Sequence, residues 1–253
     1  MKFLNRLLPV VTIVLIIALW HVVAVIYNIE LIWPKPEVAF RELVSALGDS
    51  FFWESVGNTM LRTLVAFALA FVLALLLSLF ATSSKVFYKL FYPVVVLLRA
   101  LPTISVIFIC YVAIKGWYRA IVIAFLVIFP TLFSSFFTAL ENCNGELAEV
   151  GIVYNVKRSD RLFRFIIPSV WAYMYSDIVN TLSLAVKLIV AAEAVTSTGK
   201  SLGGLMAISK ANVEMGSILA YTIVAVVLSY LTELTVRLTA RIVKEVSRKC
   251  RLH

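Results

Sequence analysis

The residues best placed to do chemistry lie in one apolar stretch, residues 169–192, where polar side chains recur at helical spacing. The intervals of four, three and four positions place four of them on one face of a helix: Ser176, Asn180, Ser183 and Lys187. Asp177 adjoins this polar stripe. A charged group inside a membrane helix is costly unless it faces a partner or water. The stripe therefore predicts the polar wall of a path through a membrane, in which Lys187 attracts an anionic group.

A second interpretation of the stripe stays open. Polar side chains also hold membrane helices together, and Lys187 would then pair with a carboxylate such as Glu193 on a neighbouring helix. Glu193 lies near the outer end of the stretch. There it would either gate the path or be partly solvated.

One segment resembles a nucleotide-binding motif. Residues 194–201 read AVTSTGKS, close to the phosphate-binding loop G-x-x-x-x-G-K-[ST]. That loop requires a first glycine, a preceding strand and a cytoplasmic helix after it, whereas Ala194 replaces the glycine and the topology derived below places the segment outside. We expect no nucleotide site here, so any ATP used in transport would bind to another subunit.

No other residues suggest catalysis or metal binding. Glu233 and Arg237 are one helical turn apart, which favours a local ion pair. His21 has no acid or cysteine at ligand spacing and is interpreted as a packing residue. The three cysteines lack the spacing of a metal site or a disulfide framework. The chain is predicted to be no enzyme and to bind no cofactor or metal.

The composition places these residues in a bilayer. Hydrophobic residues make up 62% of the 253 positions, charged residues only 15%, and the mean hydropathy is +0.99, which no single soluble core accommodates. The first apolar run continues without a cleavage site, so we interpret it as an uncleaved span. The sequence predicts an all-α membrane protein, one domain over residues 1–253, with six spans near residues 7–27, 59–80, 91–113, 120–140, 169–192 and 218–240.

Basic residues flank the spans unequally. With the N-terminus inside, the cytoplasmic segments hold 14 of the 23 lysines and arginines, among them the six between Arg237 and Arg251. Cytoplasmic connections of membrane proteins carry such an excess. Both termini and the connection 145–168 are therefore predicted to be cytoplasmic. The net charge of +9 is explained by this topology and not by nucleic acid binding.

That connection, GELAEVGIVYNVKRSDRLFRFIIP, is charged and helix-forming between two apolar spans. Basic residues alternate with large apolar ones, among them Arg158, Arg161, Leu162 and Phe163. This pattern indicates a docking segment for a soluble partner.

Prolines and small residues mark the remaining features. Pro102 and Pro130 remove a backbone donor from spans three and four and are expected to kink them, and such breaks are tolerated beside other helices or a water-filled cavity, which favours a transport path. Residues 37–47 have the apolar spacing of an amphipathic helix at the outer surface, or of a connector packed on its neighbours. The small, polar residues 195–216 predict an outer loop containing a short helix.

The connection 145–168 resembles the EAA loop of bacterial ABC-importer permeases, E-A-A-x3-G-x9-I-x-L-P. Glu149, Val150 and Gly151 stand at E-A-A, Asn155 at the glycine and Pro168 at the proline. Glu149 and Pro168 are identical to the pattern, Gly151 is small like alanine, and asparagine is the residue that best replaces glycine in a left-handed turn.

Other segments are similar to the nitrate, sulfonate and taurine branch of that family. Trp33-Pro34-Lys35-Pro36 is similar to its L-P-x-P, Arg99 to Pro102 to its R-P-x-P, and Ala191-Ala192-Glu193 with Leu202-Gly203 to its A-A-E and following L-G. Arg99 and Pro102 are thereby assigned to the path. Lys187 stands where the branch is apolar, and Tyr111-Val112-Ala113 replaces its W-F-G.

The resemblance implies a type I importer permease in the bacterial inner membrane. Two such chains, expected to be identical, would form the path for a small solute. Each EAA loop would dock on a cytoplasmic ATPase of a pair that uses ATP and Mg, and an external substrate-binding protein would deliver the solute. Two other functions stay open: a secondary transporter or channel driven by an ion gradient, and a membrane scaffold whose basic loop binds lipid headgroups.

Overall fold

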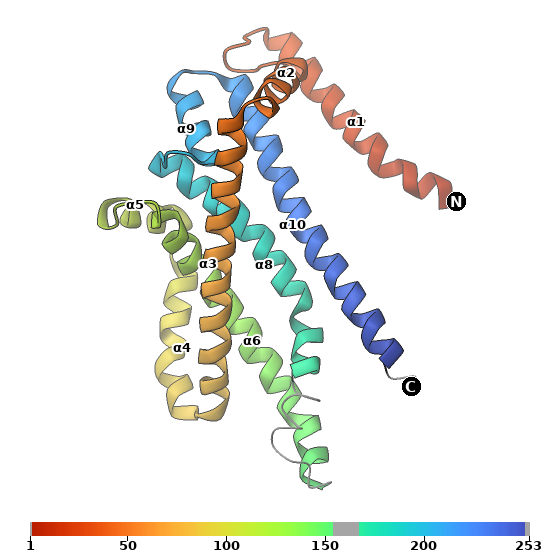
Figure 1. Cartoon of the computed structure of the whole chain (residues 1–253), viewed down its shortest axis with the longest axis vertical. Coiled ribbons are helices and arrows are strands. Elements are labelled where there is room, and N and C mark those ends of the chain that lie inside the picture. Colours follow the sequence, from red (N-terminus) through yellow and green to blue (C-terminus); the bar gives the residue numbers. More distant parts are fainter. Residues whose placement is uncertain (1, 154–166, 251–253) are drawn as a thin grey trace. The chain divides into compact units, whose positions relative to one another are not determined.

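A computed structural model describes residues 2–153 and 167–250 of the chain. Side chains are not described for residues 2–7, 9, 143–153, 167–169, 172 and 240–250. Within the described ranges every regular element is an α-helix (Figure 1), in the order α1 (Lys2–Tyr27), α2 (Pro36–Leu47), α3 (Ser50–Ser83), α4 (Lys85–Ala100), α5 (Thr103–Ala113), α6 (Arg119–Val153), α8 (Ile167–Thr196), α9 (Leu202–Ala211) and α10 (Met215–Cys250).

The helices form two compact units. One comprises Met1–Asn58 and Glu193–Val226, and the other comprises Thr59–Ala192 and Val227–His253. Helices α3, α8 and α10 each contribute one part to each unit.

The predicted spans correspond to helices of membrane-spanning length. Among the described residues, α1, α3, α6, α8 and α10 are long and apolar enough to cross a membrane, and α4 with α5 makes a sixth candidate. This agrees with the all-α prediction and its six apolar stretches. The length of each helix follows from uninterrupted apolar sequence, because a span needs about 20 such residues.

The two prolines expected to kink their spans behave differently. Helix α4 ends at Ala100 and α5 starts at Thr103, and the two axes are bent by 97° around Leu101 and Pro102. The third stretch is thus a broken span or a re-entrant loop, which is more than the predicted kink. Pro130, in contrast, lies inside the continuous helix α6, so the helix does not end there.

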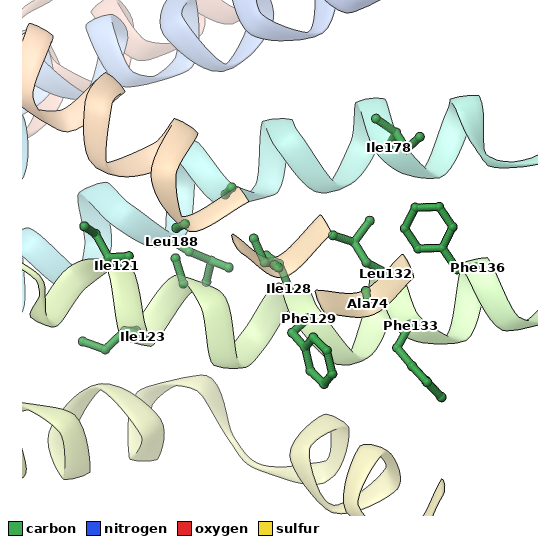
Figure 2. Close-up of a cluster of buried hydrophobic side chains, with 14 of the residues drawn as sticks. Ala74, Ile121, Ile123, Ile128, Phe129, Leu132, Phe133, Phe136, Ile178 and Leu188 are labelled. Atoms are coloured by element: carbon green, nitrogen blue, oxygen red, sulfur yellow. The ribbon is translucent and has the colours of Figure 1, made fainter. Parts of the chain in front are cut away.

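The core of the second unit is built around α6. Every third or fourth residue of α6 is buried, including Ile128, Leu132 and Phe136. In Figure 2, Phe129 and Phe133 point from α6 toward α4, where both rings contact Phe91, at centroid distances of 6.4 and 5.2 Å. Aromatic pairs at this distance add to the stability that burial provides.

A row of small residues gives α3 its place in this core. Ala66, Ala70, Ala74 and Ser78 recur every four residues and are all fully buried. Small side chains allow backbones to approach closely in membrane proteins, where packing rather than hydrophobicity drives helix association. Ala74 lies beside Leu132 in Figure 2.

In the first unit, α1 is anchored to the turn before α2. The Trp20 indole Nε1 donates to the Pro34 carbonyl over 3.1 Å. His21 Nδ1 lies 3.0 Å from Glu37 Oε1 of α2, so the interpretation of His21 as a packing residue is wrong. Residue spacing along a single helix does not reveal a partner that lies on another helix, as Glu37 of α2 does here.

The predicted amphipathic helix forms as α2. Its N-terminus follows from Pro36, whose fixed φ suits the first helical turn. Three of its apolar side chains, Phe40, Val44 and Leu47, are exposed. An exposed apolar face suits a helix lying at a membrane surface better than a packed connector.

Candidate functional site

Helix α8 carries the polar stripe on its exposed face. Ser176, Asn180 and Lys187 are exposed, whereas Ser183 lies at the buried edge with 9% exposure. The opposite face is apolar and buried, and it includes Ile178, Ala185 and Ile189. Charged and polar residues thus lie on the exposed face, beside the exposed apolar Leu184, and exposed charge is unfavourable for a helix that faces lipid. The exposed face of α8 therefore needs water or another polar surface against it.

Two opposite charges stand on this face without a partner in the described part of the chain. Neither Asp177 nor Lys187 forms an ion pair or hydrogen bond there. They are ten positions apart, which is about 15 Å along a helix axis, so they do not neutralise each other. An unpaired charge within a span marks a functional surface.

The alternative in which Lys187 pairs with Glu193 on a neighbouring helix is wrong in its geometry. Both residues belong to α8, six positions apart, and residues at that interval do not share a helix face. Glu193 is fully buried, and its Oε2 accepts a hydrogen bond from the Gly203 amide over 3.3 Å. This carboxylate holds the start of α9, so the alternative in which Glu193 is partly solvated is wrong.

A cavity of about 260 Å³ opens between α6 and α8 in the second unit. Tyr173 and Asp177 of α8 line it, together with four polar residues and one alanine of α6: Ser134, Ser135, Thr138, Ala139 and Asn142. Because several of these residues are exposed, the cavity is open to the surface of the chain. It shares Asp177 with the edge of the polar stripe.

Sequence reasoning missed the α6 side of this cavity. Ser134, Thr138 and Asn142 recur every four residues at the end of an otherwise apolar span. That interval is the same signal that identified the stripe on α8. The spacing was therefore available, but only the folded chain places this row on α6 beside Tyr173 and Asp177 of α8.

Arg99 and Pro102, the two path residues assigned by resemblance, occupy different positions. Arg99 is exposed near the end of α4, and its Nη1 donates to Ser134 Oγ over 3.2 Å. That hydroxyl in turn donates to the Pro130 carbonyl over 3.0 Å. Arg99 thus fixes one wall residue of the cavity. Pro102 is exposed at the break between α4 and α5 and lies outside the cavity lining.

The segment that imitates a phosphate-binding loop is a tight turn between two helices. Helix α8, not a strand, precedes it, and Lys200 Nζ contacts Glu54 Oε1 at 3.0 Å. Ser201 Oγ caps α9 by accepting from the Gly204 amide over 2.9 Å. A Cβ on Gly204 would lie 2.1 Å from the Thr198 carbonyl oxygen. Lys200 and Ser201 therefore have structural roles here, and the strand that a phosphate-binding loop requires is replaced by α8.

The predicted ATPase-docking loop falls largely outside the described residues. This applies to Asn155, Arg158, Arg161, Leu162 and Phe163, which lie within 154–166. Glu149, Val150 and Gly151 lie in the last turns of α6, and Pro168 lies in the first turn of α8, with only their backbone described.

The chain was compared with known protein families and with curated proteins. The family model "Binding-protein-dependent transport system inner membrane component" matches residues 70–245, more than half of the chain. A comparison with curated proteins gives no match.

Two solved structures share the fold. One is the crystal structure of a bacterial ABC transporter involved in the import of the acidic polysaccharide alginate, with a TM-score of 0.61, 15% identity, and coverage of 95% of this chain and 97% of that chain. The other is a bacterial alginate ABC transporter in complex with an alginate-pentasaccharide-bound periplasmic protein, with a TM-score of 0.57, 15% identity, and coverage of 96% and 97%. At this identity the likeness concerns the fold.

Proposed function

The chain belongs to the family of binding-protein-dependent transport system inner membrane components, and from this premise we propose that two copies of it form a solute path lined by the exposed polar face of α8. As a member of this family it is a multi-pass permease component of an ABC importer, not an enzyme. The single observation that carries the proposal is the inverted polarity of α8, with Ser176, Asn180 and Lys187 exposed on a span. A second chain that leaves water between the two α8 helices satisfies these groups.

Symmetry gives the lysine a defined role. If two identical chains are related by a two-fold axis along the membrane normal, equivalent residues lie at the same depth on opposite sides of the path. Two Lys187 ammonium groups then face a passing solute together. The proposed solute carries an anionic group, as in sulfonates, taurine or nitrate. If the two lysines serve only to keep the path hydrated, the alternative solute is a heterocyclic vitamin precursor.

Transport requires an energy source that the described residues do not supply. We propose that the loop 145–168 on each chain docks on one subunit of a cytoplasmic ATPase pair, which binds ATP and Mg. Closure of that pair would move the two loops and rock the spans between inward-open and outward-open states. An external binding protein would release solute into the outward-open path. The chain would lie in the bacterial inner membrane with both termini in the cytoplasm.

Within this loop, Glu149 acts by contact and not by catalysis. The proposed docking surface comprises Glu149, Val150, Gly151, Asn155, Arg158, Arg161, Leu162, Phe163 and Pro168. Reversing the charge at Glu149 is expected to remove favourable contacts with the ATPase, and Asn155→Pro to disrupt the left-handed turn that the resemblance implies at Asn155.

Co-purification tests the proposal. The chain is expressed with the products of its neighbouring genes, extracted in detergent, and assayed for bound ATPase and ATP hydrolysis. We expect a complex of two permease chains with an ATPase pair, and loss of substrate-stimulated hydrolysis in Glu149→Arg and Asn155→Pro. Glu214→Arg, an equal charge reversal in the connection before α10, serves as the control and should keep hydrolysis unchanged. A chain that purifies alone and moves solute in liposomes would contradict the proposal.

A further inference from the structure

The cavity between α6 and α8 has a chemical character of its own, distinct from that of Lys187. Its lining presents hydroxyl groups, one amide and one carboxylate, and Asp177 is the only charged residue among them. At about 30 Å³ per water molecule, the volume holds about nine waters. The space is thus too large for a bare metal ion and suits a small organic solute.

Asp177 is the group in this cavity that lacks a counter-ion. It lies four positions inside the candidate span Tyr173–Thr196, where an uncompensated carboxylate is costly. Within the described residues it forms no ion pair or hydrogen bond. The nearby guanidinium of Arg99 does not fill this role, because it is exposed and donates to Ser134, and it is not part of the lining.

The donor and acceptor inventory selects a cation. An ammonium group offers three hydrogens, which a carboxylate, the hydroxyl oxygens of Ser135 and Thr138, and the Asn142 amide oxygen can accept. Among the lining residues, an anion would meet the negative charge of Asp177 with only neutral donors to offset it. We propose that this cavity binds a small solute through its protonated amine, with Asp177 as the counter-ion.

This inference rests on the proposed function in one respect: the cavity shares Asp177 with the edge of the polar stripe, and so lies beside the proposed path. It sharpens the class of solute: nitrate and simple sulfonates lack the group that the cavity recognises, whereas solutes that bear an amine have it. Lys187 and Asp177 would then act on different groups or at different stages of passage.

Ligand-dependent thermal stability tests the amine site. A ligand that binds only the folded protein raises its Tm with concentration. The full chain in lipid nanodiscs is heated with ethanolammonium chloride, ethylene glycol or sodium 2-hydroxyethanesulfonate at about 100 mM. The three probes share a hydroxyethyl group and differ in the charge of the group attached to it. We expect ethanolammonium alone to raise the Tm, by about 3 °C or more.

Two variants locate the effect. Asp177→Asn keeps the shape of the side chain and is expected to weaken ethanolammonium binding by about tenfold or more, because a charge-assisted hydrogen bond becomes a neutral one. Glu141→Gln removes a carboxylate of α6 that does not line the cavity, and it should leave the Tm rise unchanged. If Asp177→Asn does not yield folded protein, Tyr173→Phe removes an exposed lining hydroxyl and should reduce the rise.

Several outcomes would overturn the site. Equal Tm rises in the parent chain and in Asp177→Asn would do so, as would stabilisation by 2-hydroxyethanesulfonate and not by ethanolammonium. The measurement uses neither ATP nor an ATPase. A negative result therefore sinks the amine site alone, while failure of the co-purification experiment would sink the proposed permease assembly and leave the Tm result intact.

Discussion

Helices α1 and α8 are both long enough to cross a membrane, yet they present opposite surfaces. In α1, only 6% of the span Val10–Tyr27 is buried within the chain, and the exposed side chains are apolar, such as Leu15 at 63% and Ile16 at 61% exposure. In α8, most of the span Tyr173–Thr196 is buried, and the exposed residues include the polar Ser176, Asp177, Asn180 and Lys187 beside the apolar Leu184 and Val195. The apolar content of a span shows that it enters the membrane, but its exposed face shows what it meets there.

The exposed faces of α1 and α8 differ because they suit different surroundings. Lipid tails offer no hydrogen-bond partners, so an exposed face that meets them must be apolar. A charged side chain such as Lys187 is tolerated only where water or a second protein surface reaches it. The surface of α1 therefore suits lipid or an apolar partner, and that of α8 suits a hydrated path.

The largest expected effect comes from placing the same charge on both helices. Leu15→Lys puts an ammonium group at the exposed apolar face of α1, at a cost of about 2.5–3.5 kcal/mol for insertion. Asn180→Lys puts it on the exposed face of α8, which faces water in the proposed path. We expect the amount of membrane-inserted protein, measured by quantitative blotting of membranes, to fall for Leu15→Lys and to match the parent for Asn180→Lys. Equal losses in the two variants would remove the distinction between the faces.

A smaller effect is expected from removing the charge on α8. Lys187→Met retains the length of the side chain and should leave membrane insertion intact or improved. If Lys187 attracts the solute, uptake by the assembled transporter should fall about tenfold, equivalent to about 1.4 kcal/mol of transition-state stabilisation. Initial uptake rates at equal amounts of protein measure this. Lys210→Met, at the exposed end of α9, is the matched control, and unchanged uptake by Lys187→Met would exclude the lysine from the path.

The smallest effect concerns the anchor of α1. Trp20→Phe removes the indole donor to the Pro34 carbonyl but keeps most of the apolar surface. The loss of one hydrogen bond should destabilise the first unit by about 1 kcal/mol. A modest fall in Tm with unchanged insertion is expected, and Trp171→Phe, an exposed tryptophan of α8, should not change the Tm. A failure of Trp20→Phe to insert would show that the α1 anchor governs insertion itself.

Much of the site was readable from helical periodicity. The polar stripe on α8 was identified because its intervals match a helix, and the structure places three of its four members on the exposed face. The same rule applied to α6 would have found Ser134, Thr138 and Asn142. Contacts between helices were less accessible: His21 with Glu37, and Arg99 with Ser134, join residues 16 and 35 positions apart. No single-helix pattern contains such pairs.

The sequence by itself determined that the chain enters a membrane, which stretches are apolar enough to span it, and which helix carries polar residues on one face. These properties follow from local apolar content and a period of 3.6 residues. Only the tertiary structure decided that Ser183 is buried while Ser176 is exposed, that Glu193 secures a turn, and that α6 and α8 enclose a cavity beside Asp177. Burial and enclosure depend on which helices pack together, and packing between distant segments is set by the fit of their surfaces.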